Sequence, residues 1–174
     1  MSRSVTTMAV LLFATGGCAT VAPNVTELGR ADIVSANGIP AGQAILTLHG
    51  ATIGLTVQAK GLTPGAHGMH LHAQGSCGGT GFASAGGHLN PGMHQHGTLN
   101  PSGAHLGDLP NLTIGRDGAG ATTIMLPGDW ATLGPELFDA DGTAIVIHAG
   151  PDDYRTDPSG NSGGRVACGI FTRK

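Results

Sequence analysis

The chain has 174 residues, enough for one domain with a hydrophobic core and too few for two ordinary domains. It contains 31 glycines and only 3% aromatic and 11% charged residues, a composition that favours turns and short strands over helices. The net charge of −3 excludes a general nucleic-acid-binding protein, which would carry a basic face, and the hydrophobic content of 40% argues against disorder.

The N-terminal segment is typical of an export signal. One cation, Arg3, precedes an uncharged and largely apolar run from Ser4 to Gly17, which is too short to span a bilayer. Small residues stand directly before Cys18 and resemble a bacterial lipobox, although Thr15 occupies the position where leucine is commoner. The segment therefore predicts export and a lipid on Cys18.

This interpretation divides the chain into three parts. They are a signal peptide over residues 1–17, a tether over residues 18–30 and a folded domain over residues 31–174. The alternative is a plain secretory signal cleaved nearby, with Cys18 incidental. Either way we expect the mature protein in the periplasm or cell envelope, held to a membrane if Cys18 carries a lipid.

The domain consists of short runs with the patterns of β-strands. Leu55, Val57 and Ala59 alternate with polar residues, which predicts a strand with one wet face. The continuous apolar run Thr143–His148 is typical of a buried strand, and residues 111–126 predict a hairpin with its turn at Asp117-Gly118. Further strands are expected over residues 43–48, 68–71 and 165–171. Seven or eight strands and no clear helix predict an antiparallel sandwich or barrel.

Two long irregular segments, residues 73–110 and 149–164, interrupt this pattern. Loops of this length in a compact domain are usually functional or disordered. Cys77 lies in the first segment, and with Cys18 set aside its only possible partner is Cys168. An even pair of cysteines in an oxidising compartment predicts a disulfide, and the alternative is two separate buried thiols.

Seven of the nine histidines lie between His67 and His105. His70 and His72 are separated by one residue, so on a strand both project from one face while Leu71 points the other way. The first long segment and the buried strand add further candidates, namely His88, His94, His96, His105, Asp108 and His148. Imidazoles with one carboxylate and no thiolate suit zinc or copper. Singly each histidine fits a structural hydrogen-bonding role, but together they predict a metal site.

Several separated motifs give the chain a family resemblance. In order they are "GAHGMHLH", "GGHLNP", "HLGDLPNL", "IVIHAG" and "GRVACGI". The chain resembles copper/zinc superoxide dismutase, and most of all its exported bacterial branch, from Asp32 to Phe171. The resemblance implies a Greek-key antiparallel β-sandwich or flattened barrel of about eight strands with two long functional loops, and it implies copper and zinc as cofactors.

The resemblance also implies two sets of ligands. Copper would be held by His70, His72, His88 and His148, and zinc by His88, His96, His105 and Asp108. His88 would bridge the two metals. The residues alone do not decide between His94 and His96, and the family's "HG" pattern favours His96. His67 would be a structural hydrogen-bonding residue, and His49 an exposed one.

Four further residues carry implied roles. Arg165 would stand beside the copper, Asp152 would link a copper ligand to a zinc ligand, and Cys77 and Cys168 would form the family's disulfide. The implied activity is dismutation of superoxide, with Arg165 and His88 as catalytic residues. Copper is required because the reaction needs a one-electron centre, whereas zinc would hold the loop and orient His88. Arg165 would focus the anionic substrate against the net negative charge.

Two other functions share part of this pattern. A non-enzymatic exported protein that buffers copper or zinc would need the histidines but not Arg165. A structural envelope lipoprotein would need neither. The expected partners are superoxide and, through Cys18, a membrane, while the choice between a monomer and a homodimer stays open.

Overall fold

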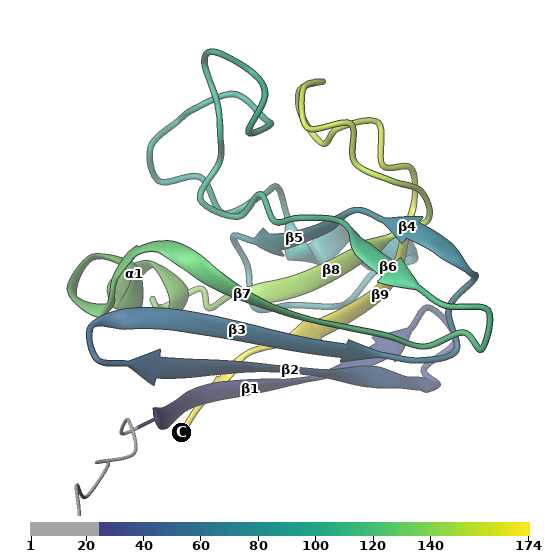
Figure 1. Cartoon of the computed structure of the whole chain (residues 1–174), viewed down its shortest axis with the longest axis horizontal. Coiled ribbons are helices and arrows are strands. Elements are labelled where there is room, and N and C mark those ends of the chain that lie inside the picture. Colours follow the sequence, from purple (N-terminus) through teal and green to yellow (C-terminus); the bar gives the residue numbers. More distant parts are fainter. Residues whose placement is uncertain (1–24) are drawn as a thin grey trace, which may run out of the picture.

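A computed structural model describes residues 25–174 (Figure 1). The predicted signal peptide, Cys18 and the first part of the tether lie outside the described residues. The described chain forms ten strands, one α-helix and one short 3-10 helix. In order these elements are β1 (Val25–Ser35), β2 (Pro40–His49), β3 (Thr52–Ala59), β4 (Gly65–His67), β5 (Met69–His72), η1 (Thr80–Ala85), β6 (Leu112–Ile114), β7 (Gly120–Asp129), α1 (Trp130–Leu137), β8 (Ala144–His148), β9 (Arg165–Ile170) and β10 (Thr172–Arg173).

Most strands belong to one curled antiparallel sheet. Its order is β5-β8-β9-β1-β2-β3-β7, with β10 paired to β1, and β4 and β6 form a separate two-stranded sheet. Strands far apart in sequence lie side by side, so long connections cross the ends of the barrel in the manner of a Greek key. The predicted all-β fold is confirmed. Figure 1 shows the two long loops, in teal and yellow-green, rising from the same side of this sheet.

The core follows the predicted strand patterns. Leu55 and Val57 of β3 are fully buried and Ala59 is 5% exposed, while Gln58 between them faces solvent. All five residues of β8 are buried, as its continuous apolar sequence predicts. The alternation on β3 therefore marks a strand with one wet face, and β8 is buried on both faces.

Strand register gives the barrel two distinct ends. Val25 begins β1 opposite His49, and Ser35 ends β1 opposite Ala167 of β9. Arg165 starts β9 and pairs with His148 at the end of β8. Arg165 and His148 therefore lie at the Ser35 end of β1, about 33 Å of strand away from Val25.

The predicted hairpin over residues 111–126 is wrong. Its turn is present, because the Gly118 N–H donates to the Gly115 carbonyl oxygen. The two strands on either side pair elsewhere, β6 with β4 and β7 with β3. Pairing with β3 gives β7 a long ladder, from Asp129 opposite Thr52 to Gly120 opposite Ala59, that the three-residue β6 cannot offer.

The helix α1 was not predicted. The Asp129 carboxylate caps it by accepting the Thr132 N–H at 3.0 Å. Gly134 and Pro135 lie inside this helix. Both residue types disfavour helices, so the sequence does not predict one here. Glycine is needed at position 134 because a Cβ there would lie 2.9 Å from the Trp130 ring.

The predicted boundary between tether and domain also needs correction. Residues 25–30, which we expected in the tether, form the first half of β1 and pair with β2. These residues are mostly exposed or half-buried and are held by backbone pairing, so they show no apolar alternation that would predict a strand. Within the described residues, no helix is long and apolar enough to cross a membrane.

Candidate metal centre

Four histidines from separate parts of the chain form the first cluster. β5 carries His70 and His72 on one face, and β8, its neighbour in the sheet, ends at His148. His88 joins them from the first long loop through a β-bridge to His72. One ring nitrogen from each of the four lies within 4.8 Å of the other three. The fold therefore brings the neighbouring pair on β5 together with two histidines that are distant in sequence, and the four form one set of metal donors.

Hydrogen bonds fix the tautomers of three of these rings. His72 Nδ1–H donates to the Gly86 carbonyl oxygen and His148 Nδ1–H to that of Gly163, both at 3.0 Å. His70 is turned the other way, and its Nε2–H donates to Asp152 Oδ2 at 2.8 Å. Each neutral ring consequently keeps a lone pair on its other nitrogen.

Those lone pairs have no protein partner. Among residues 25–174, His70 Nδ1, His72 Nε2, His88 Nε2 and His148 Nε2 are buried and accept no hydrogen bond. Buried polar atoms without a partner are rare because they lose their contacts with water and gain nothing in return. Four of them in one place are explained by a cation that accepts all four lone pairs.

Burial keeps these rings uncharged near neutral pH. It lowers the pKa of His70 to about 4 and that of His72 to about 2, and it lowers the pKa values of His88 and His148 as well. A metal ligand must be deprotonated, so these histidines are ready to bind a metal without first losing a proton.

Asp108 organises the second cluster. Its Oδ1 lies 2.8 Å from His88 Nδ1, 3.0 Å from His96 Nδ1 and 3.1 Å from His105 Nδ1. His88 Nδ1 and His105 Nδ1 are only 3.2 Å apart, so both cannot carry a proton toward each other. Three imidazoles and one carboxylate around one point are a donor set that suits tetrahedral zinc.

The charge on Asp108 is stabilised within this cluster. Burial alone would raise the pKa of its carboxyl group, but hydrogen bonds from His88 and from the Gly97 N–H outweigh that effect and lower the pKa well below its usual value. His70 also lies near this group. Its Nε2–H donates to Asp152, however, and its Nδ1 belongs to the first cluster, so His105 completes the second one.

His88 belongs to both clusters. Its Nε2 is the unpartnered atom of the first cluster, and its Nδ1 contacts Asp108 in the second. The ring is stacked on that of His70 at a centroid distance of 3.9 Å. A single imidazole therefore presents one nitrogen to each of two adjacent cation sites.

Asp152 forms a hydrogen bond with one histidine of each cluster. This buried carboxylate accepts His70 Nε2–H on Oδ2 at 2.8 Å and His96 Nε2–H on Oδ1 at 2.9 Å. The hydrogen bonds from these two rings lower the pKa of Asp152 in spite of its burial. One carboxylate thus orients one histidine of each cluster.

Two residues that support Asp152 were missed in the sequence. The Asn111 side-chain amide accepts the Asp152 N–H at 2.8 Å and donates to the Asp152 carbonyl oxygen at 2.9 Å. The Tyr154 N–H donates to Asp152 Oδ1 at 2.6 Å, and the Tyr154 hydroxyl accepts the Asn111 N–H at 2.8 Å. Asn111 lies in the "HLGDLPNL" motif, and its place in that motif is the feature of the sequence that could have identified it as a functional residue.

The remaining histidines take different places. His96 is completely buried, whereas His94 is exposed and does not contact the second cluster. The ring nitrogens of His67 lie 2.6 Å from the His148 carbonyl oxygen and 2.8 Å from that of Thr63, which is a structural role. His49 is exposed at the end of β2, as expected.

A cavity of about 390 Å³ opens beside both clusters. It is lined by His72, Gly87, His88, Asn90, His105, His148, Pro158, Ser159, Gly163 and Arg165. Arg165 is the only lysine, arginine, aspartate or glutamate in this lining. The cavity therefore presents a local positive charge in a protein whose net charge is negative.

The first long loop holds Arg165 in place. Nη1 donates to the Phe82 carbonyl oxygen at 2.8 Å and Nη2 to that of Gly86 at 2.6 Å. The Cys77–Cys168 disulfide, which the sequence predicted, is confirmed and joins the same loop to β9. The loop and the arginine are thus connected both covalently and by hydrogen bonds.

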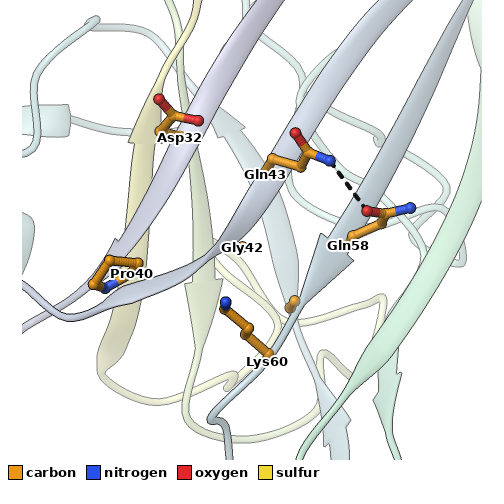
Figure 2. Close-up of a pocket in the computed structure, with 7 residues that line it drawn as sticks. Asp32, Pro40, Gly42, Gln43, Gln58 and Lys60 are labelled. Carbon is orange, nitrogen blue, oxygen red and sulfur yellow. Dashed lines mark hydrogen bonds between the residues drawn. The ribbon is translucent and has the colours of Figure 1, made fainter.

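A separate hollow of about 280 Å³ lies on the outer face of β1, β2 and β3 (Figure 2). It is lined by Asp32, Pro40, Gly42, Gln43, Gln58, Ala59 and Lys60. Gln43 Nε2 donates to Gln58 Oε1 at 3.1 Å across it. The hollow contains none of the predicted site residues.

The sequence of this chain matches one known protein family. The profile of the family described as copper/zinc superoxide dismutase (SODC) matches residues 41–171, three quarters of the chain. The chain belongs to the copper/zinc superoxide dismutase family. The family uses copper and zinc, and the two clusters supply donors that could bind both.

Individual relatives agree with this family. "Superoxide dismutase [Cu-Zn] 2" of Aquifex aeolicus is 41% identical over 82% of this chain and 85% of its own. The "superoxide dismutase-like protein YojM" of Bacillus subtilis is 46% identical over 66% of this chain and 60% of its own. The crystal structure of a SOD-like protein from Bacillus subtilis matches with a TM-score of 0.78 and 36% identity, over 84% of this chain and all of that one. The copper/zinc superoxide dismutase fold therefore extends over most of the described residues.

Proposed function

We propose that this protein is a superoxide dismutase of the cell envelope, which converts two superoxide anions and two protons into dioxygen and hydrogen peroxide. The observation that carries this proposal is the set of four unpartnered histidine nitrogens beside a cavity with one fixed cation, Arg165. A site that only stored metal would have no use for that cation.

The two clusters would hold different metals. Copper would bind His70, His72, His88 and His148, and zinc would bind His88, His96, His105 and Asp108. When bound, copper supplies a centre that accepts and returns one electron, and zinc supplies a fixed positive charge. The first set contains only imidazoles, which suit copper, and the second adds the carboxylate that suits zinc.

The residues of the chain handle the substrate and the protons. The Arg165 guanidinium is charged at every working pH and would attract the small anion into the cavity, against the net negative charge of the protein. His88 faces the first cluster with Nε2 and can hold a proton on that atom for delivery to the second superoxide. Its Nδ1 stays fixed by the second cluster, which keeps the ring oriented.

One alternative has support from the comparisons. A relative named superoxide dismutase-like is 46% identical to this chain, so a non-enzymatic exported protein that binds copper and zinc is the second candidate. This chain, however, presents four imidazoles in its first cluster and keeps Arg165 in the cavity. These features favour the enzyme.

A rate measurement tests the activity. Purified protein is loaded with copper and zinc, and the decay of superoxide is followed directly. We expect catalysed decay that persists over many turnovers, and none from the same protein loaded with zinc alone. If protein fully occupied by both metals did not catalyse the decay, the proposed enzymatic activity would be refuted and the metal-binding function would stand.

Location is tested separately. The lipobox-like sequence before Cys18 supports attachment to a membrane of the cell envelope. We expect the wild type in the membrane fraction with an acylated N-terminus, and Cys18→Ser in the soluble fraction or unprocessed. A soluble wild type without fatty acid would establish plain secretion instead.

A further inference from the structure

We propose that one end of the barrel, the end at which β1 begins, rests on the phospholipid surface, and that the cavity beside the histidines faces the aqueous phase. This inference depends on the proposed lipid at Cys18 and adds an orientation to it. We call this end the Trp130 end and define it by Val25, Trp130, Phe138, Arg173 and Lys174.

Hydrogen bonds and register bring these residues together. The Trp130 N–H donates to the Ala51 carbonyl oxygen at 2.8 Å, in the turn between β2 and β3. This turn follows His49, the residue opposite Val25. On the other side of β1, Arg173 pairs with Gly29. Figure 1 shows α1, the start of β1 and the C-terminus on the same side of the molecule.

The length of the tether limits which surface can reach a membrane. Seven Cα–Cα steps separate Cys18 from Val25, and a fully extended chain covers at most about 25 Å in that distance. Arg165 lies at the opposite end of β1, about 33 Å of strand away from Val25. Strands tilted in a barrel rise only about 25 Å over that length, so contact through the Arg165 end would need a tether stretched to its full length. The Trp130 end needs no such extension and is therefore the end that we place on the lipid.

The composition of the Trp130 end is typical of a protein surface that contacts lipid. Trp130 is the only tryptophan of the chain, and the Arg173 guanidinium carbon lies 5.6 Å from its ring centroid and 5.8 Å from that of Phe138. Tryptophan and long cationic side chains are enriched at membrane interfaces, because their apolar bodies enter the lipid while their polar ends stay hydrated.

The charged groups of this end are of both signs, since Glu136 of α1 and Asp139 after it add to Glu27 and Asp129. Glu27 pairs with both Arg30 and Lys174. Asp129 accepts the Thr132 N–H as the cap of α1. Val25 is 50% exposed and adds apolar surface next to the tether. The Trp130 end thus combines exposed Val25, the half-buried rings of Trp130 and Phe138 and two cations with several carboxylates, at the point where the tether enters the fold.

The single tryptophan provides the test. Mature protein, processed by the cell that makes it, is reconstituted into vesicles of phosphatidylethanolamine and phosphatidylglycerol, with or without brominated acyl chains, and bound protein is isolated by flotation. We expect brominated lipid to quench the fluorescence of Trp130 in the bound wild type. The matched control carries Trp130→Phe and Ile39→Trp, because Ile39 is 62% exposed and its carbonyl oxygen accepts the Ser35 N–H at the far end of β1. Its fluorescence should be unaffected.

The outcomes separate the orientation from the anchor. Bound protein with unquenched Trp130, or with quenched tryptophan at position 39, overturns the orientation and leaves the anchor intact. Wild-type protein that does not float with the vesicles refutes the anchor, and the orientation falls with it. Because the main probe is the native residue, the result does not depend on a variant that folds poorly.

Discussion

Arg165 and His72 donate hydrogen bonds to the same acceptor, the carbonyl oxygen of Gly86, at 2.6 Å and 3.0 Å. The residue proposed to attract the substrate is therefore positioned by the same loop atom that fixes the tautomer of a proposed copper ligand. The disulfide from Cys77 to Cys168 holds that loop against β9, on which Arg165 stands. Substrate guidance and metal geometry share one structural support, and they can be separated by mutation.

Arg165→Ile should lower the rate of superoxide decay by at least about tenfold, within the range expected for electrostatic focusing. Copper and zinc contents should not change, because Gly86 still accepts the His72 N–H. Arg165→Lys keeps the charge but loses the planar fork that reaches two carbonyls, so it should recover only part of the rate. Rising salt should slow the wild type more than Arg165→Ile. Equal rates in all three fully loaded proteins would exclude this role.

Asp108→Ala should abolish zinc binding while copper still binds, because the Asp108 carboxylate reaches the first cluster only through His88, whose Nε2 stays available. The change also removes the acceptor of the Gly97 and His105 N–H groups. Each buried donor left unpaired costs roughly 1–3 kcal/mol, so the melting temperature should fall by at least about 4 °C. Metal analysis and calorimetry measure both effects. A variant that retained zinc and lost copper would contradict the assignment.

Cys77→Ser should destabilise the exported protein, since the disulfide closes a loop with a sequence separation of 91 residues. The chain-entropy estimate for that loop is about 4–5 kcal/mol, an upper figure because reduced chains keep some structure. Activity should fall as well, because the released loop carries the Phe82 and Gly86 carbonyls. Reduction of the wild type serves as the matched control and should reproduce the loss. Unchanged denaturation midpoints in both samples would argue against this account.

Asp152→Ala should weaken retention of both metals, since one carboxylate orients His70 and His96. Loss of such outer partners typically costs 10–100-fold in metal affinity. Asp153→Ala is the matched control, because its carboxylate lies in the same loop but faces solvent and accepts hydrogen bonds from Thr156 and Asn161. Competition with a chelator measures the affinities. Similar losses in the two variants would reduce the role of Asp152 to general loop stability.

Acid should destabilise the metal-free protein before it affects most carboxylates. Burial lowers the pKa of His70 to about 4 in the folded state, whereas an unfolded histidine titrates near 6.5. Between these values the unfolded chain binds more protons, so the stability from this group is fully present above about pH 6.5 and is lost toward pH 4. Urea midpoints of the metal-free protein, measured on both sides of this window, should fall with pH. A constant midpoint would contradict the prediction.

Local patterns in the sequence were sufficient for several elements. Alternation along Leu55, Val57 and Ala59 identifies the buried face of β3, and spacing of one residue puts His70 and His72 on one face of β5. The two remaining cysteines have only each other as partners in an exported chain. These features depend on residue type and spacing alone, so they can be read without knowing what lies across the fold.

Other features arise only from tertiary contacts. Burial separates His96 from the exposed His94, two residues away on the same loop. The pairing of β6 with β4, and of β7 with β3, replaced a hairpin that the turn at Asp117-Gly118 favoured locally. The capped helix α1 forms despite Gly134 and Pro135, because its short length and its packing outweigh their propensities.

The sequence by itself determined the strand patterns, the disulfide partners and the residue types able to bind metal. Tertiary structure decided which nitrogen of each histidine is available, how Asn111 and Tyr154 hold Asp152, and which carbonyls hold Arg165. The physical reason is that these decisions rest largely on backbone N–H and carbonyl groups. Every residue has a carbonyl and nearly every one an N–H, so only the folded chain shows which of them meet a given side chain.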